Sequence, residues 1–426
     1  MKLPKVLRVR QNFVVGPKVD IQSTLRSEMK KFANRIRHGD RIAVGVGSRG
    51  ITNLPLIVET VLEELHRYGA KPFIIPAMGS HGGATAQGQR DVLATYGITE
   101  SSMRVPILDS MEVTQVGISS DGIPAYCSTE ARAADGIVLI NRIKPHTDFF
   151  GTLGSGLTKM CVIGLGKRTG ATAMHLAAMQ FGHERVIRNL AKVVIQNAPV
   201  LGGIAIVENQ FHDTAKIVAV PVDELEAVEN ELLVEAKSLM PRLPFEELDL
   251  LIVDQIGKNI SGAGMDPNVI NRSVHGYDSL PARGERTSPF IRRIYIRNLT
   301  PETHGNAIGI GMADAVTSRL VASMDMQVTN INALTALTPQ SAKIPIAFET
   351  DREAIEQMLA SLPISNWSDA KVARVLDTLS VAEMEISESL WSEHSSDGPL
   401  IALTELREIG FDKVGNLASP PNNPTI

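Results

Sequence analysis

The strongest constraint on the fold is a regular alternation of strand-like and helix-like stretches before residue 141. The apolar run 41–47 ends in small residues and leads into an amphipathic helical pattern over 56–68. A second apolar run over 72–76 precedes another helical pattern over about 86–96. Strands that alternate with helices in this way are typical of a parallel sheet covered by helices. The sequence therefore predicts an α/β fold.

Length and a proline-rich boundary divide this predicted fold into two domains. The chain has 426 residues, and a domain commonly holds about 100 to 200. Pro241, Pro244 and an acidic run precede residues 248–253, which read as the first strand of a second α/β unit. We predict a catalytic domain over 1–244, a second α/β domain over 245–418 and a disordered tail over 419–426. Each domain should be a mostly parallel sheet flanked by helices, with the site in the cleft between them.

Composition favours a small-molecule protein of a reducing compartment. The 42 Lys and Arg against 47 Asp and Glu give a net charge of -5, so no basic field exists to bind nucleic acid or an anionic membrane. Two cysteines are too few for a disulfide framework, and the ten histidines would have to do most of any metal ligation. No apolar stretch is long enough for a signal peptide or a membrane span, and we expect a cytoplasmic protein.

Two loops that follow predicted strands carry reactive side chains, in the position where open α/β sheets bind ligands. Arg49 could hold a carboxylate or a phosphate, although a surface salt bridge explains this residue equally well. His81 lies between glycines, where the backbone can approach a ligand and the imidazole can exchange protons near neutral pH. A lone histidine is more often structural, and its place directly after a strand is what favours a site.

A third loop, the segment 141–175, is the most informative. Six glycines fall within 141–170, and an irregular loop of that length in a compact domain is usually functional. His146 begins the loop, Lys159 follows a glycine-rich turn, and His175 lies beyond a second glycine cluster. A lysine in a crowded site can act as a nucleophile or carry a covalently bound cofactor. The alternative, a glycine-rich hinge with solvated charges, explains three reactive side chains less well.

Several familiar motifs do not fit this chain. The stretch IGLGKRTG fails as a Walker A loop, because Cys161 and Arg168 stand where that loop needs a glycine and a serine or threonine. The sequence also has no HExxH, no GxSxG and no GxGxxG that opens a helix. We interpret His183 and His212 as structural or surface residues.

Taken in order, the three loops resemble the nickel-dependent lactate racemase family. GSRG around Arg49 is similar, in degenerate form, to the family's Asp-x-Thr-Arg-Pro loop. Residues 79–82 are similar to its Gly-Thr-His-Arg. Pro145-His146, the glycines of 151–156 and Lys159 match its Pro-His, glycine-rich turn and lysine. The family's last histidine lies 16 residues after that lysine, which is the position of His175.

This resemblance implies an isomerase that racemises or epimerises a 2-hydroxy acid. Its cofactors would be nickel and a pincer mononucleotide of the pyridinium-3,5-bisthiocarboxylic acid type. Lys159 would tether the pincer, His175 would be the protein's nickel ligand, and His81 and His146 would be the two acid/base groups. Arg49 would hold the substrate carboxylate or the cofactor phosphate, and Ser80 would contact the cofactor. The other partners implied are cofactor-maturation enzymes.

The roles have a chemical reason. The C–H bond alpha to a carboxylate is too weakly acidic for an imidazole to break as a proton transfer, whereas hydride removal produces a 2-keto acid and avoids that barrier. Return of the hydride to the other face then needs a proton donor on the opposite side, which suits two histidines.

The chain departs from the family pattern at several positions. Val46 stands where the family has an aspartate, Gly82 stands where an arginine is common, and the spacing from His146 to Lys159 is longer than in the lactate enzymes. In the second domain, Lys258 is the best candidate for a substrate contact, with Asp254 and Asp266 nearby. We therefore expect a divergent branch whose substrate need not be lactate.

Two other functions stay open at this point. One is a metal-dependent dehydratase or lyase for hydroxy or sugar acids that uses His81 and His146 without the pincer. The other is a noncatalytic protein that binds a nucleotide or a metal. Neither the substrate nor the oligomeric state can be read from the sequence.

Overall fold

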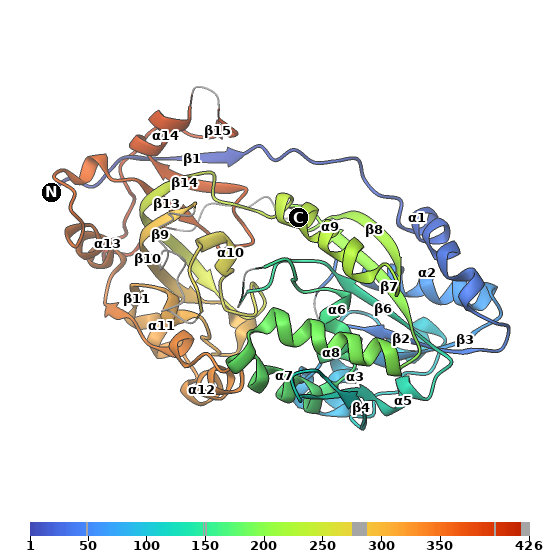
Figure 1. Cartoon of the computed structure of the whole chain (residues 1–426). Coiled ribbons are helices and arrows are strands. Elements are labelled where there is room, and N and C mark those ends of the chain that lie inside the picture. Colours follow the sequence, from blue (N-terminus) through green and yellow to red (C-terminus); the bar gives the residue numbers. More distant parts are fainter. Residues whose placement is uncertain (48–49, 148, 150, 275–287, 396–397, 419–426) are drawn as a thin grey trace. The chain divides into compact units, whose positions relative to one another are not determined.

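The computed structural model describes residues 1–47, 50–147, 149, 151–274, 288–395 and 398–418 (Figure 1). The chain forms two compact units. The first unit is Val15–Met240, and the second unit joins Met1–Val14 to the chain from Pro241 onward. Arg49 and the expected disordered tail 419–426 lie outside the described residues.

The first unit is built on a five-stranded sheet in the order β3-β2-β6-β7-β8. The first four strands are parallel and β8 is antiparallel to β7. The runs that form β2, β3 and β6 are almost wholly buried, as expected where helices cover both faces of a sheet. The strands are β2 (Arg41–Val46), β3 (Lys71–Pro76), β6 (Gly136–Arg142), β7 (Val200–Glu208) and β8 (Thr214–Pro221).

Helices cover both faces of this sheet. Side chains of α1 to α4 pack on one face, and side chains of α5 to α9 pack on the other. A separate hairpin, β4 (Val113–Ile118) and β5 (Pro124–Ser128), packs against α8. The helices are α1 (Ile21–Glu28), α2 (Leu54–Arg67), α3 (Ala86–Thr95), α4 (Glu100–Met103), α5 (Thr129–Arg132), α6 (Leu157–Lys159), α7 (Lys167–Phe181), α8 (His183–Asn197) and α9 (Leu225–Ser238).

Strand order places two of the predicted loops at one edge of the sheet. In the sheet, β3 and β6 lie on opposite sides of β2. Along the chain β3 follows β2 and β6 comes later, so the direction in which strands are added to the sheet reverses between β2 and β6. Val46 is level with Pro76 on β3 and with Ile140 on β6. The loops that lead to His81 and His146 therefore leave the sheet at the same edge, where α/β proteins of this order bind ligands.

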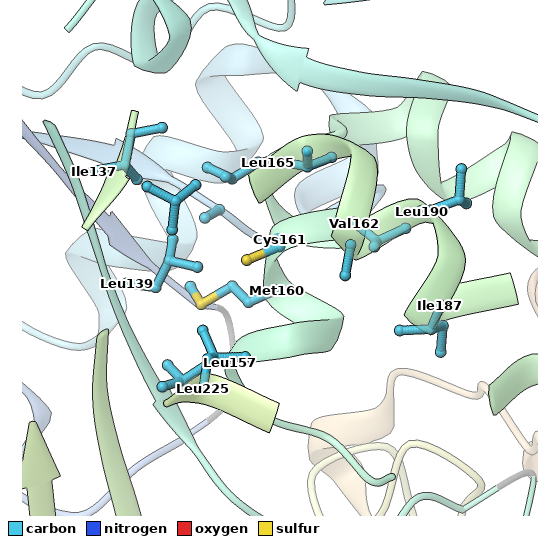
Figure 2. Close-up of a cluster of buried hydrophobic side chains, with 14 of the residues drawn as sticks. Ile137, Leu139, Leu157, Met160, Cys161, Val162, Leu165, Ile187, Leu190 and Leu225 are labelled. Carbon is cyan, nitrogen blue, oxygen red and sulfur yellow. The ribbon is translucent and has the colours of Figure 1, made fainter. Parts of the chain in front are cut away.

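The segment after β6 is more regular than the sequence predicts. Instead of a loop reaching 170, α6 continues through a π-helical turn, Met160–Gly164, and α7 begins at Lys167. Figure 2 shows why this segment is helical: Leu157, Met160 and Cys161 point into the apolar cluster that also holds Leu139 of β6. Glycine content suggests a loop, but here burial of the apolar side chains between the glycines decides the local structure.

The second unit has an eight-stranded sheet in the order β12-β11-β10-β9-β13-β14-β1-β15. The strands from β12 to β13 are parallel, and β14, β1 and β15 join by antiparallel pairing. The strands are β1 (Val6–Gln11), β9 (Glu247–Ile256), β10 (Phe290–Leu299), β11 (Ala315–Thr317), β12 (Ile346–Phe348), β13 (Val372–Val375), β14 (Glu383–Ser387) and β15 (Leu400–Ala402).

Helices also cover this second sheet on its two faces. Side chains of α10, α11 and α14 belong to one apolar cluster, and those of α13 belong to the other. The helices are α10 (Pro267–Ile270), α11 (Ser318–Ser323), α12 (Met326–Thr335), α13 (Asp351–Ala360) and α14 (Glu388–His394). Both units thus confirm the predicted α/β class of mostly parallel sheets flanked by helices.

The first residues of the chain do not lie in the unit to which the sequence assigns them. The sequence predicts one domain over 1–244, but β1 pairs with β14 and β15, so residues up to Val14 belong to the second unit. The residues of a single N-terminal strand do not indicate which distant strand it pairs with. None of the helices in the described ranges has both the length and the apolar character needed to cross a membrane.

Candidate active site

Two of the predicted site residues are in direct contact. A hydrogen bond joins Lys159 Nζ to His146 Nε2. The His146 side chain is buried, with 7% of its surface exposed, whereas Lys159 is partly exposed. When the lysine is protonated, Nζ donates and Nε2 accepts, so the ring proton is carried by Nδ1. The structure thus pairs an amine with an imidazole that can take its proton.

The loop that carries His146 is closed at its base by backbone pairing. Lys144 and Ser155 exchange two hydrogen bonds, with N···O distances of 2.9 and 2.7 Å. A Cβ on Gly154 would lie 2.3 Å from the carbonyl oxygen of Lys144, so no larger residue fits there. The glycine-rich sequence after His146 is therefore required by a close approach of two backbone segments.

Lys159 is held in place by a carboxylate from another helix. Glu229 of α9 accepts hydrogen bonds through Oε2 from Thr158 N at 2.9 Å and from Thr158 Oγ1 at 2.8 Å. Asn141 Nδ2 also donates to the Gly156 carbonyl at 2.8 Å. The α6 N-terminus has no capping side chain of its own, and Glu229 supplies that cap. Burial raises the pKa of Glu229 to about 7, against the opposing effect of its hydrogen bonds to Thr158.

Aromatic rings connect His146 to His175. Phe149 stacks on His146 at 4.3 Å between ring centroids and on His183 at 5.2 Å. The His183 ring then meets the His175 ring nearly edge-on, with centroids 6.3 Å apart and an interplanar angle of 72°. These four side chains form what we call the ring cluster. It places the predicted nickel ligand and one predicted acid/base group in one continuous set of contacts.

The ring cluster depends on two adjacent helices. His175 lies on α7 and His183 begins α8, and the two helices pack side by side (Figure 1). Gly182 stands between them at φ 82°, so the chain turns sharply there. The sequence alone suggests a structural or surface role for His183, and the structure places its ring beside that of the predicted nickel ligand. The sequence indicates two helices, the second from about 184, but not the packing of α7 on α8 that brings His175 and His183 together.

The His81 loop has the glycine conformations that its sequence indicates. Ser80 and His81 are exposed. Gly82 has φ +63°, and a Cβ on it would lie 2.5 Å from the backbone of Gly88. The position where the family commonly has an arginine therefore has no room for a side chain in this chain. The proposed role of His81 rests on the resemblance and on the shared sheet edge.

The chain that follows Arg49 is fixed by an ion pair that the sequence did not reveal. Arg142, at the end of β6, pairs with Glu208, at the end of β7. Glu208 Oε1 also accepts a hydrogen bond from Thr52 N at 2.9 Å, and Arg142 Nη1 donates to Gly50 O at 3.4 Å. This pair anchors the chain that follows Arg49, although Arg49 itself lies outside the described residues.

The residues predicted in the second unit have mostly structural contacts. Lys258 is exposed and donates from Nζ to Gly262 O at 3.1 Å. Asp254 is buried and paired with Arg297 and Arg374, so it belongs to an ion network within the sheet. Asp266 accepts a hydrogen bond from Asn268 N at 3.0 Å and caps α10. Of these three, Lys258 alone presents an exposed charge.

No group of three or more histidine, cysteine, aspartate or glutamate side chains in the described ranges is arranged to hold a metal ion. Cys127 and Cys161 are buried, and burial raises the pKa of Cys127 to about 12 and that of Cys161 further still. The donor set that remains at the candidate site is one amine and several imidazoles. Such a set fits a cofactor that brings its own donors, binds to an amine and needs one imidazole from the protein.

Fold and site together define an α/β protein with reactive residues after parallel strands, and comparison with known proteins finds a matching family model. Residues 13–186 match the model of the lactate racemase N-terminal domain. No curated protein matches the chain.

Solved structures agree in fold. The chain is similar to the lactate racemase apoprotein from Thermoanaerobacterium thermosaccharolyticum, with a TM-score of 0.55 and 14% identity over 88% of this chain and 99% of that one. It is also similar to a Thermotoga maritima protein from a structural genomics programme, with a TM-score of 0.50 and 14% identity over 80% and 86% of the two chains. The resemblance stated from the sequence is confirmed: residues 13–186 match the lactate racemase N-terminal domain, and the fold is similar to that of a lactate racemase apoprotein.

Proposed function

We propose that this protein is a racemase or epimerase of a 2-hydroxy acid that works with a lysine-tethered nickel-pincer nucleotide. The observation that carries the proposal is the contact between Lys159 Nζ and His146 Nε2, continued through the ring cluster to His175. An attachment amine, an acid/base imidazole and a candidate nickel ligand thus lie within one contact network. The membership of residues 13–186 in the lactate racemase N-terminal domain supports the same assignment.

In this proposal Lys159 holds the pincer through its side-chain nitrogen, and His175 supplies the protein's ligand to nickel. When bound, the cofactor supplies a ring carbon that takes a hydride from the substrate and returns it. His146 is suited to the first step at Lys159, since its Nε2 can accept a proton as the amine becomes a nucleophile. The cofactor and the residues fit without a cluster of three protein ligands.

His146 and His81 then handle the substrate's hydroxyl proton. Once Lys159 Nζ is part of a neutral linkage, it no longer presents an ammonium to His146 Nε2, and that nitrogen is available to the hydroxyl group. One imidazole removes the hydroxyl proton as the 2-keto acid forms, and the other returns a proton when hydride is delivered to the opposite face. We assign the carboxylate or cofactor phosphate to Arg49, a cofactor contact to Ser80 and a substrate contact to Lys258.

The experiment that tests this function follows a label at C2. Protein made beside cofactor-maturation enzymes is incubated with single enantiomers of 2-hydroxy acids deuterated at C2, in ordinary water. A hydride route predicts that the opposite enantiomer accumulates with deuterium still at C2. Loss of deuterium to water would point to proton abstraction, and formation of a dehydrated product without nickel would favour the dehydratase. Binding without turnover would favour the noncatalytic alternative.

A further inference from the structure

Lys167 is a buried lysine that the proposed reaction does not use. It is the first residue of α7, has 0% of its surface exposed and lies at φ +52°. Its Nζ donates to the Pro76 carbonyl at 2.6 Å and to Gln89 Oε1 at 3.4 Å. Both acceptors are neutral oxygens. The Asp109 carboxylate favours the charged lysine electrostatically, but burying an ammonium whose hydrogen bonds go only to neutral oxygens is costly. A methionine would fill the same space at less cost, so stability alone does not explain this lysine.

Gln89 extends the contact to the loop that carries His81. Its side chain is fully buried on α3. Nε2 donates to the Gly79 carbonyl at 2.8 Å and to the His81 carbonyl at 3.2 Å, while Oε1 faces Lys167. The amide oxygen therefore binds the lysine, and the amide nitrogen binds the loop.

The same loop also packs against the segment before α7. A Cβ on Gly79 would lie 2.8 Å from the Ile163 side chain, and one on Gly164 would lie 2.8 Å from the Ala77 carbonyl. Packing brings the two segments together, but a loop with positive φ at Gly79, Gly82 and Gly83 has many other conformations available. Directed hydrogen bonds to its carbonyls select one of them.

We propose that Lys167 and Gln89 are positioning residues that fix the His81 loop relative to α7, the helix that carries His175. Lys167 ties α7 to the end of β3, and Gln89 passes this restraint to the two carbonyls that bracket Ser80. The helix that carries His175 and the loop that carries His81 would then keep the same relative position while substrate binds and product leaves. The value of this restraint to catalysis rests on the proposed function, but the restraint itself does not.

Hydrogen-deuterium exchange of the full chain tests the restraint through paired variants. Gln89→Glu keeps the size and the acceptor that faces Lys167 but removes the two donated hydrogen bonds. Lys167→Met keeps the packing and removes the ammonium. The matched controls are Gln87→Leu, on the exposed side of α3, and Lys192→Met, an exposed lysine on α8. Signals of the His81 ring in NMR spectra provide a second readout.

We expect exchange in residues 79–84 to rise about tenfold in Gln89→Glu and Lys167→Met, which corresponds to about 1.4 kcal/mol of lost hydrogen bonding. The controls and the amides of β2 and β6 should not change, and the His81 ring signals should shift while those of His146 stay. Unchanged exchange in 79–84 in both variants would overturn the proposal. An equal rise across the whole first unit would overturn it too, because that result describes general destabilisation. Failure of the proposed function would appear separately, as a wild-type protein without a Lys159 adduct.

Discussion

Lys159 Nζ and His146 Nε2 are hydrogen-bonded although the two residues are 13 positions apart in the chain. The contact forms because the loop between them is closed at Lys144 and Ser155, which returns the chain to the end of β6 before α6 begins. This closure brings the Lys159 amine into contact with the His146 imidazole, although both belong to one glycine-rich segment. The predictions below concern the residues that build and surround this contact.

The ring cluster predicts a measurable role for His183. His183→Ala removes the ring that meets His175, and we expect nickel affinity to fall about tenfold, because outer partners of a ligating histidine commonly contribute 10- to 100-fold. His183→Phe keeps a ring and should restore much of the affinity. Nickel titration of cofactor-loaded protein measures both. Equal affinities for wild type and His183→Ala would show that the ring contact has no effect on the ligand.

Lys167 predicts how stability changes at alkaline pH. Burial lowers its pKa from 10.5 to about 8, with Asp109 acting in the opposite direction. Between these values the unfolded chain binds more protons than the folded one, so the free energy of unfolding rises with pH, by at most about 3 kcal/mol. Lys167→Met should lack this rise. Denaturant melts from pH 7.5 to 10 make the comparison, and parallel curves for the two proteins would contradict it.

Glu229 predicts the opposite slope at lower pH. Its pKa is raised from 4.5 to about 7 by burial, so the folded protein binds more protons than the unfolded chain between those values. The free energy of unfolding should therefore fall as pH rises through this window, by up to about 3 kcal/mol. Glu229→Gln retains an acceptor for Thr158 and should remove the slope. The same denaturant melts, from pH 4.5 to 8, test this, and a slope retained in Glu229→Gln would exclude Glu229 as its source.

Gly82 and Gly83 in the His81 loop allow the stability cost of backbone strain to be measured separately from the cost of a steric clash. Gly82 and Gly83 both have positive φ, but a Cβ on Gly83 meets nothing within 4 Å. We expect Gly83→Ala to cost about 1 kcal/mol of stability from strain alone. Gly82→Ala must also displace the Gly88 backbone and should cost about 2 to 4 kcal/mol. Similar melting temperatures for the two variants would show that the Gly82 contact is not restrictive.

Much of the fold follows from the sequence because strand periodicity and helix ends are local properties. The apolar runs 41–47 and 72–76 are correctly predicted as strands, β2 and β3. Ser380 and Glu383 have the spacing of a helix capping box, but Glu383 lies on β14 and pairs with Arg8 and Arg10 of β1. Ion pairing across a sheet overrides a local pattern that is otherwise compatible with a helix.

The candidate site was predictable only where its residues follow strands. Lys159 and His146 follow β6 along the chain, so order and spacing could indicate them. Glu229 comes from a helix remote in sequence, and Gln89 comes from the helix that follows the His81 loop. Both act through buried hydrogen bonds, which leave no periodic pattern. His183 needed the turn at Gly182 and the packing of α7 on α8, both of which are set by tertiary structure.

The most direct test of the central claim is native mass spectrometry, with elemental analysis, of protein made beside the cofactor-maturation enzymes. Lys159→Ala is compared with wild type and with Lys192→Ala, a change at an exposed lysine of α8. We predict that wild type and Lys192→Ala carry nickel and a covalent adduct that peptide mapping places on Lys159, whereas Lys159→Ala carries no adduct. A wild-type protein with neither nickel nor an adduct, or an adduct that persists in Lys159→Ala, would contradict the account.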